Sequence, residues 1–397
     1  MTAGRDSFCR RGSTACPQPV RHLVIWGSAM PESVASPTRR TVLRTAAAAG
    51  GLSAAALSLR PTPAAAGGSR TELVLLGTSG GPVPMSGRAG ISSALVVDGR
   101  VYLVDCGPGT FGRYAQAALA AEQLEAVFLT HLHSDHLADL YPLLWLRFGG
   151  FQALGGPVQV YGPGSAGELP KVWPAGRAVD TVSPASPAPG TAELLRRHIE
   201  GTAYDINVRM RSEGWPDIRE LIVPHDIRFR MPRGAGPDRL MAPPMKPFEV
   251  MRDERVRVTA VLVEHPPVFP SFAFRFDTAD GSVVFSGDTA PCGNVERLAC
   301  GADVLVHEVM DLATLKRGGL RPAQLRHMEI SHTDAGRLGP LAERAGAGTL
   351  VLSHLVPGAV GLVPDSAWHA KAQRGYSGRV VVGRDLARLP VRRARRG

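Results

Sequence analysis

Cysteine is scarce in this chain, with only five in 397 residues. None of them has the close spacing of a zinc finger, which excludes a small Cys-rich zinc module. Cys106 lies in an apolar stretch, so we expect it to be a buried small residue. Cys292 and Cys300 could form a disulfide in an oxidising compartment, but their spacing alone does not require one.

Long apolar runs are also missing. The apolar stretch at residues 45–59 is rich in Ala and Gly and falls short of the ~20 residues of a membrane-spanning helix. It follows the pair Arg39-Arg40 and precedes a small-residue run at 63–66, an order that resembles a twin-arginine export signal. We therefore expect residues 1–66 to be removed after passage through the twin-arginine export machinery, leaving a periplasmic or extracellular protein.

The body of the chain lacks a net charge, although the whole chain has a formal charge of +10. Residues 1–66 hold eight Arg and two acidic residues, and the basic tail at 391–397 holds four Arg. Residues 67–390 are therefore neutral, which argues against broad binding to a phosphate backbone. The first 29 residues show no periodic pattern, and this favours Met30 over Met1 as the true start.

Repeats at a solenoid period are absent, and short apolar runs instead alternate with helical patterns. Two strand-rich halves are each followed by helices, which predicts an α+β sandwich of two sheets flanked by helices. The strands are expected at 72–76, 94–97, 101–105, 126–129, 158–161, 256–263, 271–276, 282–285, 304–306 and 349–352, and the main helices at 111–124, 136–148 and 333–345.

One long segment, at about 164–250, interrupts this pattern and is rich in Pro and Gly. It has helical patterns near 192–206 and 217–222. We interpret it as an insertion, within a domain spanning 67–390, that shapes the entrance for a substrate. A surface decoration without function is the alternative.

Three histidines and an aspartate lie within six residues directly after the expected strand at 126–129: His131, His133, Asp135 and His136. Imidazole nitrogens and carboxylate oxygens are ligands that Zn²⁺ takes. In an extended segment His131 and His133 point to the same side, whereas Asp135 and His136 fall at a loop-to-helix turn and face a second position. The loop therefore predicts ligands for two metal ions.

Three more ligand-type residues each lie just beyond an apolar strand, as His131 does. They are His265, Asp288 and His354. Strand ends on a rigid sheet hold convergent polar groups well. Their common position therefore favours one shared site over isolated structural histidines.

With these motifs the chain resembles the metallo-β-lactamase-fold superfamily of binuclear hydrolases, and within it the ribonuclease Z and arylsulfatase-like branch. Residues 77–82, 105–110 and 306–308 also match that branch. The resemblance extends over about 72–362 outside the insertion. It implies a four-layer αββα sandwich.

The resemblance also implies how the ligands divide. His131, His133 and His265 would hold one metal, Asp135, His136 and His354 the other, and Asp288 would bridge both. Two Zn²⁺ ions are expected, with Mn²⁺ or Fe²⁺ as an alternative at one position. A hydroxide shared by the two metals would be the nucleophile, and Asp135 would also orient it.

A candidate acid for the leaving group comes from the same resemblance. His332 matches a branch histidine that precedes a helix, and Glu308 matches its acidic partner. The alternative for His332 is a polar residue beside a helix cap at Ser331 or Thr333. We expect His307 to be structural. The histidines His198, His225, His327 and His369 have no ligand context, and only His225 is a candidate for substrate contact.

Ribonuclease Z proper carries a Gly- and Pro-rich arm that grips tRNA between the counterparts of His265 and Asp288. These two residues are 23 apart here, which disfavours tRNA as a partner. We therefore expect hydrolysis of a small-molecule phosphodiester, with arylsulfatase as the alternative. Lactonase and β-lactamase activity rank lower, and a non-catalytic metal-binding protein ranks last. Dimers are common in this branch, so a homodimer is one option.

Overall fold

A computed structural model of the chain describes residues 70–147 and 156–393. The predicted signal peptide and the alternative start at Met30 lie outside the described residues, and so do the last four residues of the basic tail. Within the described ranges, no helix has the length and apolar character needed to cross a bilayer.

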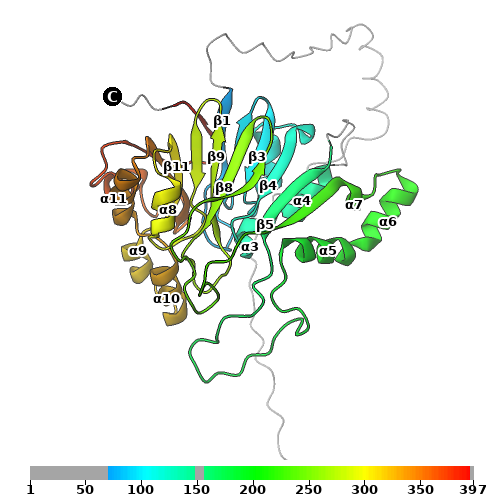
Figure 1. Cartoon of the computed structure of the whole chain (residues 1–397), viewed down its shortest axis with the longest axis horizontal. Coiled ribbons are helices and arrows are strands. Elements are labelled where there is room, and N and C mark those ends of the chain that lie inside the picture. The colour runs from blue at the N-terminus through cyan, green and yellow to red at the C-terminus, as the bar shows by residue number, and fades with distance from the viewer. Residues whose placement is uncertain (1–69, 148–155, 394–397) are drawn as a thin grey trace, which may run out of the picture. The chain divides into compact units, whose positions relative to one another are not determined.

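Two seven-stranded sheets form the centre of the fold, with helices on the outer side of each (Figure 1). This arrangement confirms the predicted α+β sandwich. The first sheet has the order β14-β1-β2-β3-β4-β5-β6, with strands β1 (Thr71–Gly77), β2 (Ser92–Val97), β3 (Arg100–Val104), β4 (Leu124–Phe128), β5 (Val158–Pro163), β6 (Ile222–Ile227) and β14 (Ala387–Pro390). The second has the order β13-β12-β11-β10-β9-β8-β7, with strands β7 (Phe248–Arg252), β8 (Val256–Leu262), β9 (Phe272–Thr278), β10 (Ser282–Phe285), β11 (Val304–Met310), β12 (Thr349–Val356) and β13 (Arg379–Val382).

Helices cover the outer faces. The described helices are α2 (Thr110–Gln116), α3 (Ser134–Leu137), α4 (Leu140–Leu146), α5 (Thr191–Gly201), α6 (Ala203–Ser212), α7 (Ile218–Leu221), α8 (Gly293–Leu298), α9 (Leu312–Arg317), α10 (Pro322–Ser331), α11 (Ala335–Ala345) and α12 (Asp365–Ala372), with a 3₁₀ turn at Ala121–Gln123. One apolar cluster joins α2, α4 and α5 to the first sheet, and another joins α8, α11 and α12 to the second.

A third apolar cluster fills the space between the sheets. In it, Phe128 of β4 packs edge-on against two rings of β9 in the opposite sheet, with centroid distances of 5.6 Å to Phe274 and 5.0 Å to Phe276. Buried aromatic pairs of this geometry stabilise a core beyond the area that they bury. They fix β4, which leads into the histidine-rich loop, against the second sheet.

The predicted helix at 136–148 is wrong in one respect, because the structure divides it into α3 and α4. Pro142 lies in the first turn of α4, where its missing N–H is tolerated. A continuous helix would place the same proline in an interior, where it breaks the hydrogen-bond ladder. Asp139, at the break, accepts a hydrogen bond from the backbone N of Phe111 at 3.0 Å.

The segment at 164–250 is not only an insertion. It supplies β6, which pairs in parallel with β5, and β7, which pairs antiparallel with β8, so it closes one edge of each sheet. Strand β6 was not predicted because Pro224 interrupts its apolar pattern, and proline is tolerated in strands at such edges. The additional segments are therefore the stretches before β6 and between β6 and β7.

The structure has Cys106, Cys292 and Cys300 as free thiols, with Cys106 buried as expected. Cys292 precedes α8 and Cys300 follows it. A helix of six residues is about 9 Å long, whereas the Cα atoms of a disulfide lie within about 7 Å of each other. The disulfide that the spacing allowed is therefore not formed.

Two glycines near the start of α2 provide a test of the packing around the histidine-rich loop. A Cβ on Gly107 would lie 2.3 Å from the backbone oxygen of Asp135, whereas one on Gly112 meets nothing within 4 Å. We expect Gly107→Ala to lower the free energy of unfolding by about 1–3 kcal/mol. Gly112→Ala, the matched control, should raise it by about 0.5–1 kcal/mol because it removes a helical glycine. Urea unfolding measures both, and equal midpoints would contradict the packing described.

Candidate metal centre

The loop after β4 leads directly into α3, and this turn separates its four ligand-type residues into two pairs. His131 and His133 precede α3, while Asp135 and His136 lie in its first turn. His131, Asp135 and His136 are buried, and His133 is partly exposed. The predicted division of the loop into two faces is therefore present in the structure.

The first set of ligand atoms gathers His131, His133, His265 and Asp288. The Nδ1 atom of His133 lies 3.0 Å from Nε2 of His131 and 3.3 Å from Nε2 of His265. The Oδ2 atom of Asp288 lies 3.9 Å from Nε2 of both His131 and His265. Three nitrogens and one oxygen thus converge from three separate chain segments.

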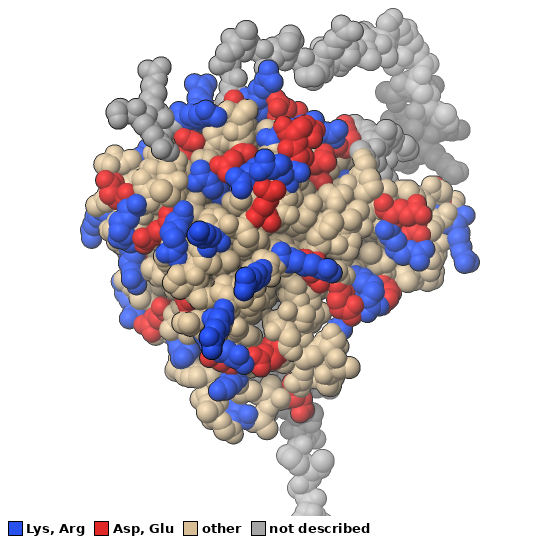
Figure 2. Space-filling view, in the orientation of Figure 1, with Lys and Arg blue, Asp and Glu red and all other residues tan. Residues whose placement is uncertain are grey.

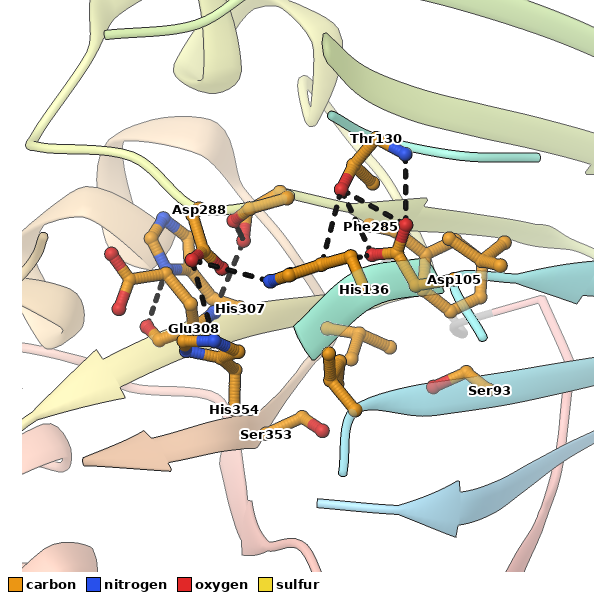
Figure 3. A pocket seen from close by; sticks show the side chains of 15 residues that line it. Ser93, Asp105, Thr130, His136, Phe285, Asp288, His307, Glu308, Ser353 and His354 are labelled. Atoms are coloured by element: carbon orange, nitrogen blue, oxygen red, sulfur yellow. Dashed lines mark hydrogen bonds and ion pairs between the residues drawn. The ribbon is translucent and has the colours of Figure 1, made fainter. Parts of the chain in front are cut away.

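The second set gathers Asp135, His136, His354 and the same Asp288. Oδ2 of Asp288 lies 3.3 Å from Nε2 of His136 and 3.3 Å from Nε2 of His354. Oδ2 of Asp135 lies 3.7 Å and 3.5 Å from the same two nitrogens. Figure 3 shows the side chain of Asp288 next to those of His136 and His354. The structure therefore brings all seven predicted ligands together, with Asp288 common to both sets.

The donor atoms fit a pair of divalent cations. Within the described residues, Nε2 of His136 and Oδ1 of Asp288 are buried without a hydrogen-bond partner. Buried polar atoms are almost always paired, so these two need a partner that the protein itself does not supply. Imidazole nitrogens with carboxylate oxygens are the donor set of zinc and related ions.

A β-bulge positions His354. Strands β11 and β12 pair in parallel up to Glu308 with Ser353, and the register resumes with Val309 opposite Leu355. His354 is the extra residue, with φ of 45°. Bulges re-aim side chains next to functional sites. The imidazole of His354 packs closely against Gly80, where a Cβ atom on residue 80 would lie 2.5 Å from Nδ1 of His354.

A second layer of residues holds the ligand rings. Asp105, after β3, lies 2.8 Å from Nδ1 of His136 and accepts hydrogen bonds from the backbone N and Oγ1 of Thr130 (Figure 3). Nδ1 of His265 lies 3.0 Å from the backbone oxygen of Ser331. Such partners fix the ring orientation and the tautomer of a ligating histidine. The sequence analysis did not assign Asp105 to the site, although Asp105 follows an apolar strand just as the ligands do.

Burial and charge act in opposite directions on these groups. Burial is the main cause that holds the pKa of His131 and His265 well below the usual range and lowers the pKa of His133 to about 4. Burial would raise the pKa of Asp288, but the charges of His354 and His136 outweigh it and hold that pKa well below its usual range. Burial therefore favours the neutral, metal-binding form of His131, His133 and His265. At His136 burial would lower the pKa, but the charges of Asp288 and Asp105 outweigh it and raise that pKa well above its usual range.

His332 and Glu308 lie at one side of the same centre. Nδ1 of His332 is 3.3 Å from Oε1 of Glu308 and 4.0 Å from Oδ2 of Asp288. Burial would lower the pKa of His332, but the charge of Glu308 outweighs it, and the pKa is raised. The cap of α11 is Asp334, which accepts from the backbone N of Gly336. The cap is therefore neither Ser331 nor Thr333.

His327 is a residue that the sequence analysis set aside. It lies on α10, with its ring centroid 6.0 Å from that of His133, 5.7 Å from that of His265 and 5.4 Å from that of His332. Only the fold brings α10 to the centre, so no local pattern around this residue signalled its position.

His225 and His307 belong to neither ligand set. The ring of His225 stacks on Tyr161 at 4.5 Å and its Nε2 lies 2.7 Å from Oε1 of Gln159, at the edge of the first sheet. The structure does not bring His225 to the centre. His307 is buried inside β11, where its Nδ1 lies 2.7 Å from the backbone oxygen of Glu308.

Comparison with known proteins agrees with this architecture. Residues 87–146 match the model of the metallo-beta-lactamase superfamily. Among solved structures, human tRNase Z, short form, is similar with a TM-score of 0.51 and 21% identity, over 81% of this chain and 99% of that one. The metallo-beta-lactamase fold protein YhfI from Bacillus subtilis is similar with a TM-score of 0.51 and 18% identity, over 80% of this chain and 99% of that one. The fold is thus that of the metallo-β-lactamase hydrolases.

Comparison with curated sequences identifies the family within the metallo-β-lactamase superfamily. A ribonuclease Z of Mycobacterium bovis (strain BCG / Pasteur 1173P2) is 34% identical over 329 residues, which cover 81% of this chain and 98% of the relative. A ribonuclease Z of Mycobacterium avium (strain 104) is 34% identical over 323 residues, with coverage of 81% and 98%. The chain belongs to the ribonuclease Z family of the metallo-β-lactamase superfamily.

The shared carboxylate leads to a prediction about metal content. We expect two divalent ions per chain after zinc loading and dialysis, and at most one in Asp288→Ala, because both ligand sets lose the same oxygen. Asp277→Ala is the matched control, since Asp277 is partly exposed and pairs with Arg275 at 2.8 Å. Elemental analysis counts the ions, and circular dichroism verifies the fold. Two ions in folded Asp288→Ala would contradict the bridge.

Proposed function

We propose that this chain is an exported hydrolase that cleaves a phosphodiester bond of a small molecule with two Zn²⁺ ions. The observation that carries the proposal is Asp288, which lies within 4 Å of ligand nitrogens in both sets. A carboxylate in that position suits two cations ~3.5–4 Å apart. Membership of the ribonuclease Z family supports phosphodiester chemistry.

The seven ligands would hold the metals as the resemblance implies. His131, His133 and His265 would bind one ion, Asp135, His136 and His354 the other, and Asp288 both. When bound, two such ions lower the pKa of a water and polarise the phosphoryl oxygens. Mn²⁺ or Fe²⁺ at one position is the alternative.

The remaining steps belong to the side chains. Asp135, with Oδ2 at the edge of the second set, would accept a hydrogen bond from the attacking water and orient it. His332 would donate a proton to the leaving oxygen, and the adjacent carboxylate of Glu308 keeps its imidazole protonated. Glu308 is itself held in place, because Oε1 accepts from the backbone N of Thr289 and of Thr333.

The short connection between two ligands supports a small substrate. The stretch from His265 to Asp288 contains β9, β10 and their turns, with no room for an arm of the kind that grips tRNA. A sulfate ester is the alternative substrate at the same centre. Lactone and β-lactam hydrolysis rank below it.

RNA is a second candidate substrate, and two observations favour it. The relatives are named ribonuclease Z. In addition, Arg228, Arg230 and Arg233, just after β6, are exposed and form no ion pair with any described residue. Figure 2 shows basic side chains across the centre of this face, with acidic side chains among them. The neutral charge of residues 67–390 counts against a large polyanion.

Residues 1–66 support export. The arginine pair at Arg39-Arg40, the apolar stretch after it and the small residues at 63–66 have the order of a twin-arginine signal. The mature protein would then act in the periplasm or outside the cell. The N-terminal sequence of the secreted protein tests this.

Three substrates test the function directly. Zinc-loaded protein should hydrolyse bis(p-nitrophenyl) phosphate, and Asp288→Ala should lose at least about 1000-fold in kcat/KM, as expected for an essential group. Asp277→Ala should retain full activity. Turnover of p-nitrophenyl sulfate alone would move the protein to arylsulfatase chemistry, and cleavage of a precursor tRNA in preference to the diester would move it to RNA. No turnover of any of them with two metals bound would refute ester hydrolysis.

The pair His332–Glu308 predicts a pH effect. His332 acts in its protonated form, so activity should fall as the pH rises through its raised pKa. Glu308→Gln keeps the acceptor at Oε1 but removes the charge, so that pKa should fall and the alkaline limb should move to lower pH by about 1 unit or more. Glu329→Gln, which alters the partner of Lys316 on the surface of α10, is the control. An unchanged kcat profile in Glu308→Gln would exclude this role.

A further inference from the structure

An apolar pocket of about 320 Å³ is lined in part by the two loops that carry the candidate ligands His131, His133 and His265. Leu132, between the ligands His131 and His133, forms part of its wall, as does Pro267, two residues after the ligand His265. Val268 also lines the pocket, and its backbone N donates to the backbone oxygen of His265 at 2.8 Å. One side of the pocket is thus the same turn that carries a ligand.

The opposite side comes from the additional segments around α5 and after β6. Three hydrogen bonds connect these segments. Oγ of Ser165 donates to the backbone oxygen of Ala188 at 2.6 Å, and Oγ1 of Thr191 donates to the backbone oxygen of Pro163 at 2.9 Å. The backbone N of Lys171 donates to the carboxylate of Asp238. The walls therefore belong to several chain segments that are hydrogen-bonded to one another.

The lining is rigid and offers few polar groups. Six prolines contribute to it: Pro163, Pro170, Pro189, Pro237, Pro267 and Pro270. Proline has a fixed φ and no N–H, so these walls lose little entropy on binding and donate no backbone hydrogen bond at those positions. Among the described lining residues, Glu168 alone carries a charge, and its Oε1 lies 3.4 Å from Arg239.

The loop between β5 and α5, which supplies part of the pocket wall, also reaches α10. The guanidinium of Arg326 lies 5.2 Å from the ring centroid of Trp173, within the range of a cation–π contact. The next residue of α10 is His327, whose ring is 5.7 Å from that of His265. The loop that forms the pocket and the helix at the edge of the metal centre are therefore in contact.

We propose that this pocket binds an aryl or branched apolar group of the ester that is cleaved at the metal centre. The inference rests on the proposed function and names its substrate class. A pocket without cationic lining cannot compensate a phosphate or sulfonate, whereas burial of an uncharged ring against proline, leucine and phenylalanine is favourable. The substrate is accordingly an ester with a sizeable uncharged apolar substituent rather than a chain of successive phosphates.

Leu169 gives the sharpest test, because it lines the pocket and its side chain is 46% exposed, so the fold tolerates its replacement. With bis(p-nitrophenyl) phosphate as substrate, we expect Leu169→Asp to lower kcat/KM about tenfold or more, through KM. Leu169→Met should stay near the wild-type value. Val182→Asp is the matched control, since Val182 lies in the same loop, is 88% exposed and does not line the pocket.

A second measurement does not depend on turnover. Calorimetric titration with p-cresol should show binding to the wild-type chain and to Val182→Asp, and at least about tenfold weaker binding to Leu169→Asp. If no diester is hydrolysed but p-cresol binds in this pattern, the pocket is confirmed and the proposed function fails. If diesters are hydrolysed and Leu169→Asp matches Val182→Asp in both measurements, the pocket proposal is overturned and the function stands.

Discussion

The carboxylate of Asp288 is the constraint on which the rest of the site depends. It is 2% exposed and faces five imidazoles that belong to two ligand sets. A buried ionised carboxylate is costly unless positive charge compensates it. Burial drives His131 and His265 toward their neutral forms, whereas the charges of His354 and His136 stabilise the carboxylate. Divalent cations held by both sets would add to this compensation. Each segment that carries a ligand must therefore reach the same point.

The sandwich meets this requirement by ending its strands at one edge. The loop with His131 and His133 follows β4, His265 follows β8, and Asp288 follows β10. His354 is different, because it lies inside β12 and not after its end. The bulge in β12 turns that one side chain toward Asp135 and Asp288. The rigid sheets thus hold the ligands with little need for rearrangement.

The candidate metal centre and the apolar pocket are formed largely by different parts of the chain. The match to the ribonuclease Z of Mycobacterium bovis covers 81% of this chain, and the residues 87–146 that match the superfamily model include four of the seven candidate ligands. The pocket is formed largely by the additional segments on either side of β6. A fold and its centre define a chemistry, whereas the surrounding loops select what is cleaved. A chain of this family can therefore have the same phosphodiester chemistry and a different substrate.

Local patterns in the sequence determined the histidine-rich loop, the sandwich class and most central strands, with β10 at the predicted residues 282–285. These features depend on spacing over a few residues, where side-chain alternation and apolar runs carry the information. Tertiary structure alone decided the bulge at His354, the approach of His327, the edge strands β6 and β7, and the apolar pocket. Each of these arises from contacts between segments far apart in the chain, and such contacts leave no periodic signal in the residues that make them.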